Sequence, residues 1–219
     1  MGLPKILVKI LPESWVYNYT LNKQIKSISP DMSEVEWIAK GKLSPPPPAV
    51  KRKVIKVYAE KHKINYFVET GTFMGDTSFE MKDVFEKVYT IELDEKLFLR
   101  AKNRFEKYPT ISVIQGDSGV VLDQILQKIS PPKTCLFWLD GHYSGGVTAG
   151  HDSIPPILNE IDIIYKYGHN HIILIDDARL FDETHNGYPS IESLTAHIKT
   201  HDKNALIEVK DDLIMITSE

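Results

Sequence analysis

The chain has 219 residues, of which 42% are hydrophobic and 26% are charged, and its formal net charge is −4. This balance is typical of one globular domain and excludes a disordered chain. The weak negative charge gives no basic field for a nucleic-acid backbone, so nucleic acid is not an expected partner. The single cysteine, Cys135, lies in an apolar run and favours a reduced compartment, so we expect a cytoplasmic protein.

Residues 1–48 are expected to form an N-terminal extension, and residues 49–219 the main domain. The first twelve residues alternate apolar side chains with lysine, a pattern that predicts neither a signal peptide nor a membrane span. Ser33 precedes a short predicted helix with a capping box. The run Ser44–Pro48 must be extended, because proline lacks an amide donor, and it marks the boundary.

A helix is predicted from Ala49 to Lys63, with Val50, Val54, Val57 and Tyr58 on its apolar face. Its other face is basic. A basic run of this kind is more often a solvated helix face than a phosphate-binding patch, so we expect its lysines to face solvent.

From residue 65 onward, short apolar runs alternate with segments of helical period, which predicts right-handed crossovers and a parallel sheet covered on both faces. Two apolar runs joined by a polar turn, at 205–209 and 213–216, predict a closing antiparallel hairpin. The expected fold class is α/β, a doubly wound, mostly parallel, seven-stranded Rossmann-like sheet. The five parallel strands are predicted at 66–69, 87–92, 111–115, 135–139 and 172–175, and the helices between and after them at 77–86, 95–107, 119–129, 154–167 and 190–201.

The loop after the first predicted strand has the form of a nucleotide-binding turn. Gly71 and Gly75 bracket the turn from strand to helix, where glycine lets the backbone approach a ligand closely. Their spacing differs from the G-x-G-x-x-G fingerprint, which disfavours a nicotinamide cofactor. Glu92 ends the next strand about twenty positions later, where an acid accepts hydrogen bonds from ribose hydroxyls. Asp117 follows the third strand and can accept from an adenine amino group. A tight turn with helix-capping acids would produce the same pattern without a cofactor.

This ordered set resembles the class I S-adenosylmethionine-dependent methyltransferases, from about residue 50 to the closing hairpin. The resemblance implies that S-adenosylmethionine is the cofactor and that the chain is a methyltransferase. It places the glycine loop near the methionine part, Glu92 at the ribose, and Asp117 with Ser118 beside the adenine. The cofactor-binding residues predicted in this way are Glu69, Thr70, Gly71, Thr72, Gly75, Asp76, Thr77, Glu92, Asp117, Ser118 and Asp140.

Acidic residues also follow the fourth and fifth predicted strands, on the same sheet edge as the glycine loop. This pattern looks like the metal-dependent O-methyltransferases of the catechol and macrolide-sugar types, in which such acids bind magnesium. The resemblance implies a Mg²⁺ site at Asp140, Asp176 and Asp177 that would orient an acceptor hydroxyl. Without a metal, Asp140 would cap the helix that begins near residue 154, and Asp177 would pair with Arg179.

His142 is the predicted general base and His151 the second candidate, with Asp140 as the third catalytic residue, because a neutral imidazole can take a hydroxyl proton near neutral pH. The glycine-bearing segment 143–152 could be a lid over the acceptor. The other histidines considered are expected to be loop residues or to lack companions: His169, His171, His185, His197 and His201.

The leading hypothesis is an O-methyltransferase that acts on a hydroxyl of a sugar or another small polyhydroxylated metabolite. The segment Asp140–Gly146 supports this acceptor class, because it is similar to methyltransferase-like proteins of bacterial polysaccharide or secondary-metabolite pathways. Homo-oligomers are compatible with the sequence. Two alternatives stay open: a non-catalytic scaffold that binds a partner through the aromatic N-terminal extension, and a metal-dependent hydrolase that uses Asp140, His142, Asp176 and Asp177.

Overall fold

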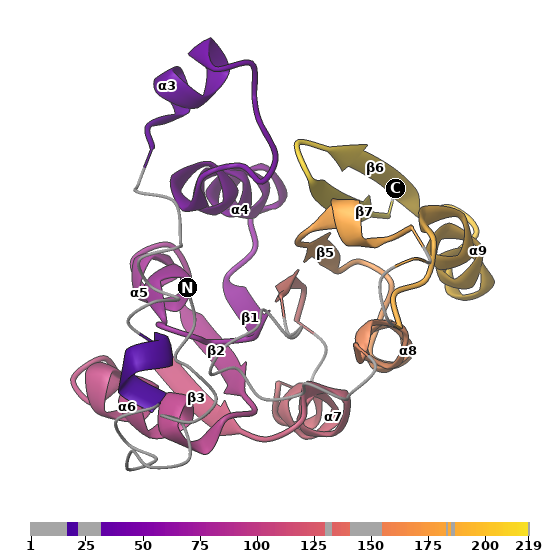
Figure 1. Cartoon of the computed structure of the whole chain (residues 1–219). Coiled ribbons are helices and arrows are strands. Elements are labelled where there is room, and N and C mark those ends of the chain that lie inside the picture. Colours follow the sequence, from indigo (N-terminus) through magenta and orange to yellow (C-terminus); the bar gives the residue numbers. More distant parts are fainter. Residues whose placement is uncertain are drawn as a thin grey trace, which may run out of the picture.

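Seven strands form one sheet in the order β3-β2-β1-β4-β5-β7-β6 in the computed structural model of the chain (Figure 1). The structure describes residues 17–21, 32–129, 133–140, 155–182, 184 and 187–218. The strands are β1 Tyr66–Thr70, β2 Lys87–Glu92, β3 Ile111–Gln115, β4 Cys135–Leu139, β5 Ile172–Ile175, β6 Leu206–Lys210 and β7 Leu213–Thr217.

The first five strands are parallel, and the last two form an antiparallel hairpin that joins the sheet through β7. The predicted fold class is therefore confirmed. The order of the strands reverses at the centre of the sheet, because β1 pairs with β2 on one side and with β4 on the other. In an open parallel sheet, ligands bind at such a reversal, outside the carboxyl ends of the strands.

Two apolar layers cover the sheet, because successive strand residues point to opposite faces. Phe137 and Leu139 of β4 pack with one set of helices, whereas Leu136 and Trp138 pack with the other set. The first set is α7 Ser118–Lys128, α8 Ile157–Lys166 and α9 Ile191–His201, and the second is α4 Pro48–His62, α5 Asp76–Met81 and α6 Glu95–Phe105. Figure 1 shows these two sets on opposite sides of the sheet.

Helix α4 begins one residue earlier than predicted, and its apolar face contains Val50, Val54 and Tyr58 as predicted but not Val57. Pro48 takes the first helical position, where its missing amide hydrogen leaves no intrahelical bond unmade. The stripe toward the sheet consists of Val50, Ile55 and Ala59, whereas Val57 is 48% exposed. The prediction for Val57 was therefore wrong. The face of α4 that packs against the sheet is centred on Ile55 and Ala59, and Val57 lies outside it.

The N-terminal region contributes two short helical pieces. Helix α3, Glu34–Ala39, begins with the predicted capping box, in which Ser33 and Glu36 exchange hydrogen bonds. Its Trp37 is buried and donates to the carbonyl oxygen of Leu43 at 2.8 Å. A single helical turn at residues 17–21 packs on α6, where Leu21 contacts Leu97. Among the described helices, none combines the length and the apolar character needed to cross a bilayer.

Candidate functional site

The glycine loop connects β1 to α5 at the strand-order reversal. Gly71 has a φ of 87° and donates its amide to the carbonyl oxygen of Ile91 at 3.0 Å, which bends the chain over the end of β2. Gly75 has a φ of 77°, and a Cβ added there would lie 2.6 Å from the ring of Phe105. Both glycines are therefore required by the backbone path, and the loop has one defined shape.

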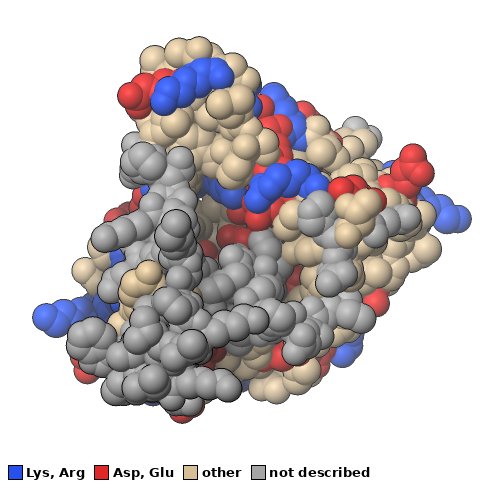
Figure 2. All heavy atoms as spheres, in the orientation of Figure 1, with Lys and Arg blue, Asp and Glu red and all other residues tan. Residues whose placement is uncertain are grey.

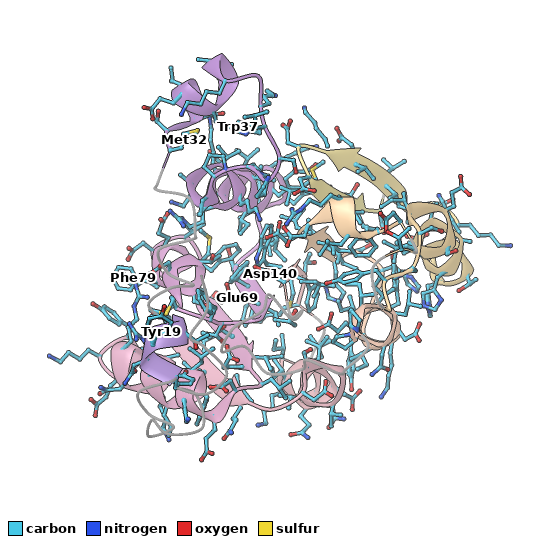
Figure 3. All side chains as sticks on the ribbon, in the orientation of Figure 1. Tyr19, Met32, Trp37, Glu69, Phe79 and Asp140 are labelled. Carbon is cyan, nitrogen blue, oxygen red and sulfur yellow. The ribbon has the colours of Figure 1, made fainter. Side chains whose placement is uncertain are left out.

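Glu69 lies beneath this loop and is 2% exposed. Its Oε2 accepts hydrogen bonds from the hydroxyls of Ser78 at 2.5 Å and Thr90 at 2.7 Å. Burial raises the pKa of this carboxyl to about 7, although the two hydroxyl donors oppose the shift. Figure 3 shows Glu69 at the middle of the sheet, close to Asp140 of the neighbouring strand end.

Glu92 ties the loop to the end of β2. One carboxylate oxygen accepts from the amide of Phe73 at 2.8 Å, and the other accepts from the amide of Asp94 at 2.9 Å. Phe73 has a φ of 46°, which is unusual for a residue with a side chain. Burial raises the pKa of Glu92, while these amide donors oppose the shift. A carboxylate oxygen has two lone pairs, so each oxygen can still accept from a ligand hydroxyl.

Asp117 caps α7, because its Oδ1 accepts from the amide of Gly119 at 2.8 Å. The capping alternative is therefore confirmed for this residue. It does not conflict with adenine binding, because a capped carboxylate keeps acceptor capacity. Ser118 follows it and is 8% exposed.

The helical turn at residues 17–21 adds a residue that the sequence did not indicate. Tyr17 makes a side-chain hydrogen bond to Asp94, and burial together with Asp94 and Glu92 raises its pKa to about 12. Lys96 lies 4.5 Å from the centre of the Tyr17 ring. The N-terminal region therefore reaches the side of the site where Glu92 lies.

The predicted acidic residues of the fourth and fifth strands do come together. The amide of Asp140 donates to the carbonyl oxygen of Thr70 at 3.1 Å, and the amide of Asp176 donates to that of Leu139 at 3.1 Å. Side-chain oxygens of Asp140, Asp176 and Asp177 all lie within 4.8 Å of one another. We refer to these three residues as the acidic triad.

A lysine from α4 reaches into the acidic triad. The ammonium of Lys51 lies 2.6 Å from Oδ2 of Asp176 and 3.3 Å from Oδ1 of Asp177. Burial alone would lower the pKa of Lys51, but Asp176, Asp177 and Asp140 raise it to about 12. The expectation that the basic face of this helix is solvated was therefore wrong at Lys51, whose side chain is 16% exposed.

Asp176 and Asp177 have further donors around them. The other oxygen of Asp176 accepts from the amide of Asp177 at 2.8 Å, and Oδ1 of Asp177 accepts from Arg179 at 2.8 Å. Arg179 also pairs with Asp212 of the turn between β6 and β7. The predicted Asp177–Arg179 pair is confirmed. In Figure 2, basic and acidic side chains lie next to one another below the part of the molecule that α3 and α4 form.

The acidic triad does not fit a divalent cation in this arrangement. Its carboxylate oxygens are suitable ligands for magnesium. Oδ1 of Asp177, however, already accepts from both Lys51 and Arg179, and Oδ2 of Asp176 accepts from the Lys51 ammonium. An ion bound to these oxygens would also lie beside the Lys51 ammonium and be repelled by it.

Several predicted residues lie elsewhere. His142 and His151, with the predicted lid 143–152 and His185, lie outside the described residues. Asp140 does not cap α8, because that helix begins after Pro156 without a side-chain cap. His171 is buried in the loop before β5, where its Nδ1 accepts from the amide of Cys135 at 3.1 Å.

His197 and His201 have a companion that the sequence did not indicate. Both Nε2 atoms lie 2.7 Å from Oδ1 of Asp162 on α8. The expectation that these histidines stand alone was therefore wrong. Their spacing of four residues places both histidines on one face of α9. Asp162 joins them only because α8 packs beside α9.

The structure is similar to solved methyltransferases. A putative caffeoyl-CoA O-methyltransferase from Staphylococcus aureus matches with a TM-score of 0.54 and 14% identity, covering 91% of this chain and 100% of that one. An SAH-bound methyltransferase from Podospora anserina matches with a TM-score of 0.56 and 13% identity, covering 95% and 89%. An O-methyltransferase from Bacillus cereus in complex with SAH matches at 0.53 and 17%, covering 94% and 99%.

The chain has the class I methyltransferase fold. Because these identities are low, the similarity establishes the fold alone. The activity has to be argued from the residues of the site. No protein-family model matches the chain, and no curated protein matches it in sequence.

Proposed function

We propose that this protein is an S-adenosylmethionine-dependent O-methyltransferase that acts on a hydroxyl of a sugar or another small polyhydroxylated metabolite. The observation that carries the proposal is Glu92, which ends β2 next to the strand-order reversal of a methyltransferase fold. One of its oxygens accepts from Phe73 of the glycine loop and the other from Asp94. A carboxylate in this position suits the two hydroxyls of a ribose.

In the proposed reaction, the acceptor oxygen attacks the methyl carbon of the sulfonium. The C–O bond forms as the C–S bond breaks, and the acceptor proton passes to a base. The products are S-adenosylhomocysteine and a methyl ether. His142 and His151 stay the predicted bases, and the binding of both reactants side by side supplies much of the rate increase.

The acceptor side supports a polar, uncharged substrate rich in hydroxyls. Lys51 and Arg179 offer donors at this end of β5, and the acidic triad offers acceptors. Donors and acceptors placed side by side can bind adjacent hydroxyls from both directions. Such mixed polarity favours a sugar over an apolar acceptor.

Calorimetric titration with S-adenosylhomocysteine tests the donor half of the proposal. We expect binding to the full chain, and loss of measurable binding in the Glu92→Ala variant. Glu95→Ala changes an exposed glutamate three residues away, so its affinity should equal that of the original protein. The absence of heat with the intact protein would contradict the proposal.

Candidate sugars and polyols, each with labelled S-adenosylmethionine, test the acceptor half. We expect label in an ether product of at least one polyhydroxylated acceptor. Label that appears only in small apolar phenols would contradict the acceptor class while leaving cofactor binding intact.

The remaining expectations stay predictions: residues 1–48 as a separate extension, a cytoplasmic location and a homo-oligomer. A hydrolase that depends on a metal at the acidic triad is disfavoured, because Lys51 opposes binding of a divalent ion at these carboxylates.

A further inference from the structure

Lys51 differs from the other lysines of α4 in what surrounds it. The side chain of Lys53 is 57% exposed and pairs with Glu34, and that of Lys56 is 43% exposed and pairs with Glu80. The side chain of Lys51 is 16% exposed and contacts Asp176, which is itself 3% exposed. A lysine is seldom buried to this degree unless its charge is paired.

We propose that Lys51 is a built-in cation that takes the place of a divalent metal on the acceptor side, so that the protein transfers methyl groups without a bound metal. This inference rests on the proposed function, because it assigns the acceptor side of the same site.

The position of Lys51 is built into the start of α4. Pro46 and Pro47 are buried, and Pro48 opens the helix, so the first turn is held against the molecule. Lys51 lies just after this opening, where the helix macrodipole disfavours a positive charge. The negative charges of the acidic triad offset this unfavourable interaction, so the position of Lys51 depends on the carboxylates it contacts.

The carboxylate partners leave little room for a metal. Magnesium requires several oxygen ligands in near-octahedral geometry at about 2.1 Å. The Lys51 ammonium is at hydrogen-bond distance from Oδ2 of Asp176, at 2.6 Å, so an ion on that oxygen would meet the ammonium directly. Arg179 occupies Oδ1 of Asp177 from the other side.

An ammonium can also serve the acceptor. It has three N–H donors, and the contacts with Asp176 and Asp177 use two of them. The third can donate to an acceptor oxygen and hold it near the sulfonium methyl. Lys51 then orients the acceptor as a metal would, and the acceptor proton leaves to a separate base.

Binding of Mn²⁺, followed by electron paramagnetic resonance, tests this proposal without an acceptor. Mn²⁺ binds carboxylate ligands as Mg²⁺ does, and its unpaired electrons give a signal in electron paramagnetic resonance. We expect no binding to the intact protein at millimolar Mn²⁺, and one bound ion in Lys51→Met, with affinity at least about 100-fold higher once the repelling charge is removed. Lys53→Met, which removes an exposed charge from the same helix, should behave like the intact protein.

Two results would overturn the proposal. One is Mn²⁺ binding to the intact protein that is lost in Asp176→Asn. The other is a Lys51→Met variant that remains folded by circular dichroism and binds no Mn²⁺, because the triad would then not be a metal site from which Lys51 displaces the ion. If Lys51→Met fails to fold, Lys51→Gln removes the charge while keeping an N–H donor for Asp176, and the same titration applies to it.

S-adenosylhomocysteine binding separates this inference from the proposed function. Lys51→Met should retain that binding, because the ammonium pairs with Asp176 and Asp177, which lie after β5 and outside the glycine loop. Absence of cofactor binding to the intact protein would refute the proposed function, whereas Mn²⁺ binding that Asp176→Asn abolishes would refute only the role of Lys51.

Discussion

The two halves of the site use different physical means to hold polar groups at the same sheet edge. On the β1–β3 side, buried carboxylates accept from hydroxyls and backbone amides, as Glu69 and Glu92 do. On the β4–β5 side, carboxylates pair with the cations Lys51 and Arg179. The first half is therefore set by the local backbone, and the second by charges from distant segments.

This difference predicts different sensitivities. Hydrogen bonds from hydroxyls and backbone amides to a buried carboxyl group depend on where the donors are placed, so changes in the loop backbone should weaken them most. A buried ion pair depends on both partners, so removal of one partner leaves an uncompensated charge. Four variants, taken from the largest expected effect to the smallest, test this distinction through the free energy of unfolding.

Lys51→Met should lower the free energy of unfolding by about 3–5 kcal/mol above pH 8, because it leaves the buried Asp176 without its cation. The loss should be smaller at neutral pH, since burial and Asp140 raise the pKa of Asp176 to about 8 and the carboxyl can then hold a proton. Urea denaturation measures this change. Lys51→Met with Asp176→Asn should recover part of the loss, since the second change removes the stranded charge. Equal stability of Lys51→Met and the intact protein would show that the β4–β5 half does not depend on this ion pair.

Gly75→Ala should lower the free energy of unfolding by about 2–4 kcal/mol, because the new Cβ would meet the buried Phe105 ring at a positive φ. Gly41→Ala is the matched control, since Gly41 also has a positive φ but no atom within 4 Å of the added Cβ. Its effect should be about 1 kcal/mol. Similar effects at both positions would mean that the loop tolerates a shift.

Glu69→Gln should change how stability depends on pH. The pKa of Glu69 in the folded protein, about 7, lies above its ordinary value of 4.5, so between these values the folded state holds a proton that the unfolded chain has released. This stabilisation is complete below about pH 4.5 and is lost as the pH rises through about 7. Glutamine lacks it.

The stability of the intact protein relative to Glu69→Gln should therefore fall by on the order of 2–3 kcal/mol between pH 5 and pH 8. Thermal and urea unfolding across this range measure the difference. Glu95→Gln, at an exposed position, should give a constant difference. A constant difference for Glu69→Gln as well would refute the burial effect.

Asp162→Asn should change the free energy of unfolding by less than about 1 kcal/mol, because its contacts with His197 and His201 are partly exposed. This pair lies outside both halves of the site and gives a baseline for charge changes at the surface. If Asp162→Asn lowered the free energy of unfolding as much as Lys51→Met does, the partly exposed Asp162 contacts would stabilise the fold as strongly as the buried Lys51–Asp176 pair.

The sequence by itself determined the alternation of strands and helices, the closing hairpin and the positions of the acids at the strand ends. These features follow from local period and from turn chemistry, which a short stretch of sequence contains. The glycine loop was predictable for the same reason, since Gly71 and Gly75 are required by the backbone of one short turn.

Only the tertiary structure decided which charges meet. Lys51 has the same sequence surroundings as the exposed lysines of its helix, and Asp212 lies in a hairpin turn far along the chain. Tyr17 reaches Asp94 through the packing of a short N-terminal turn. Contacts between such distant segments depend on the register in which helices pack on the sheet, and that register has no local signal in the chain.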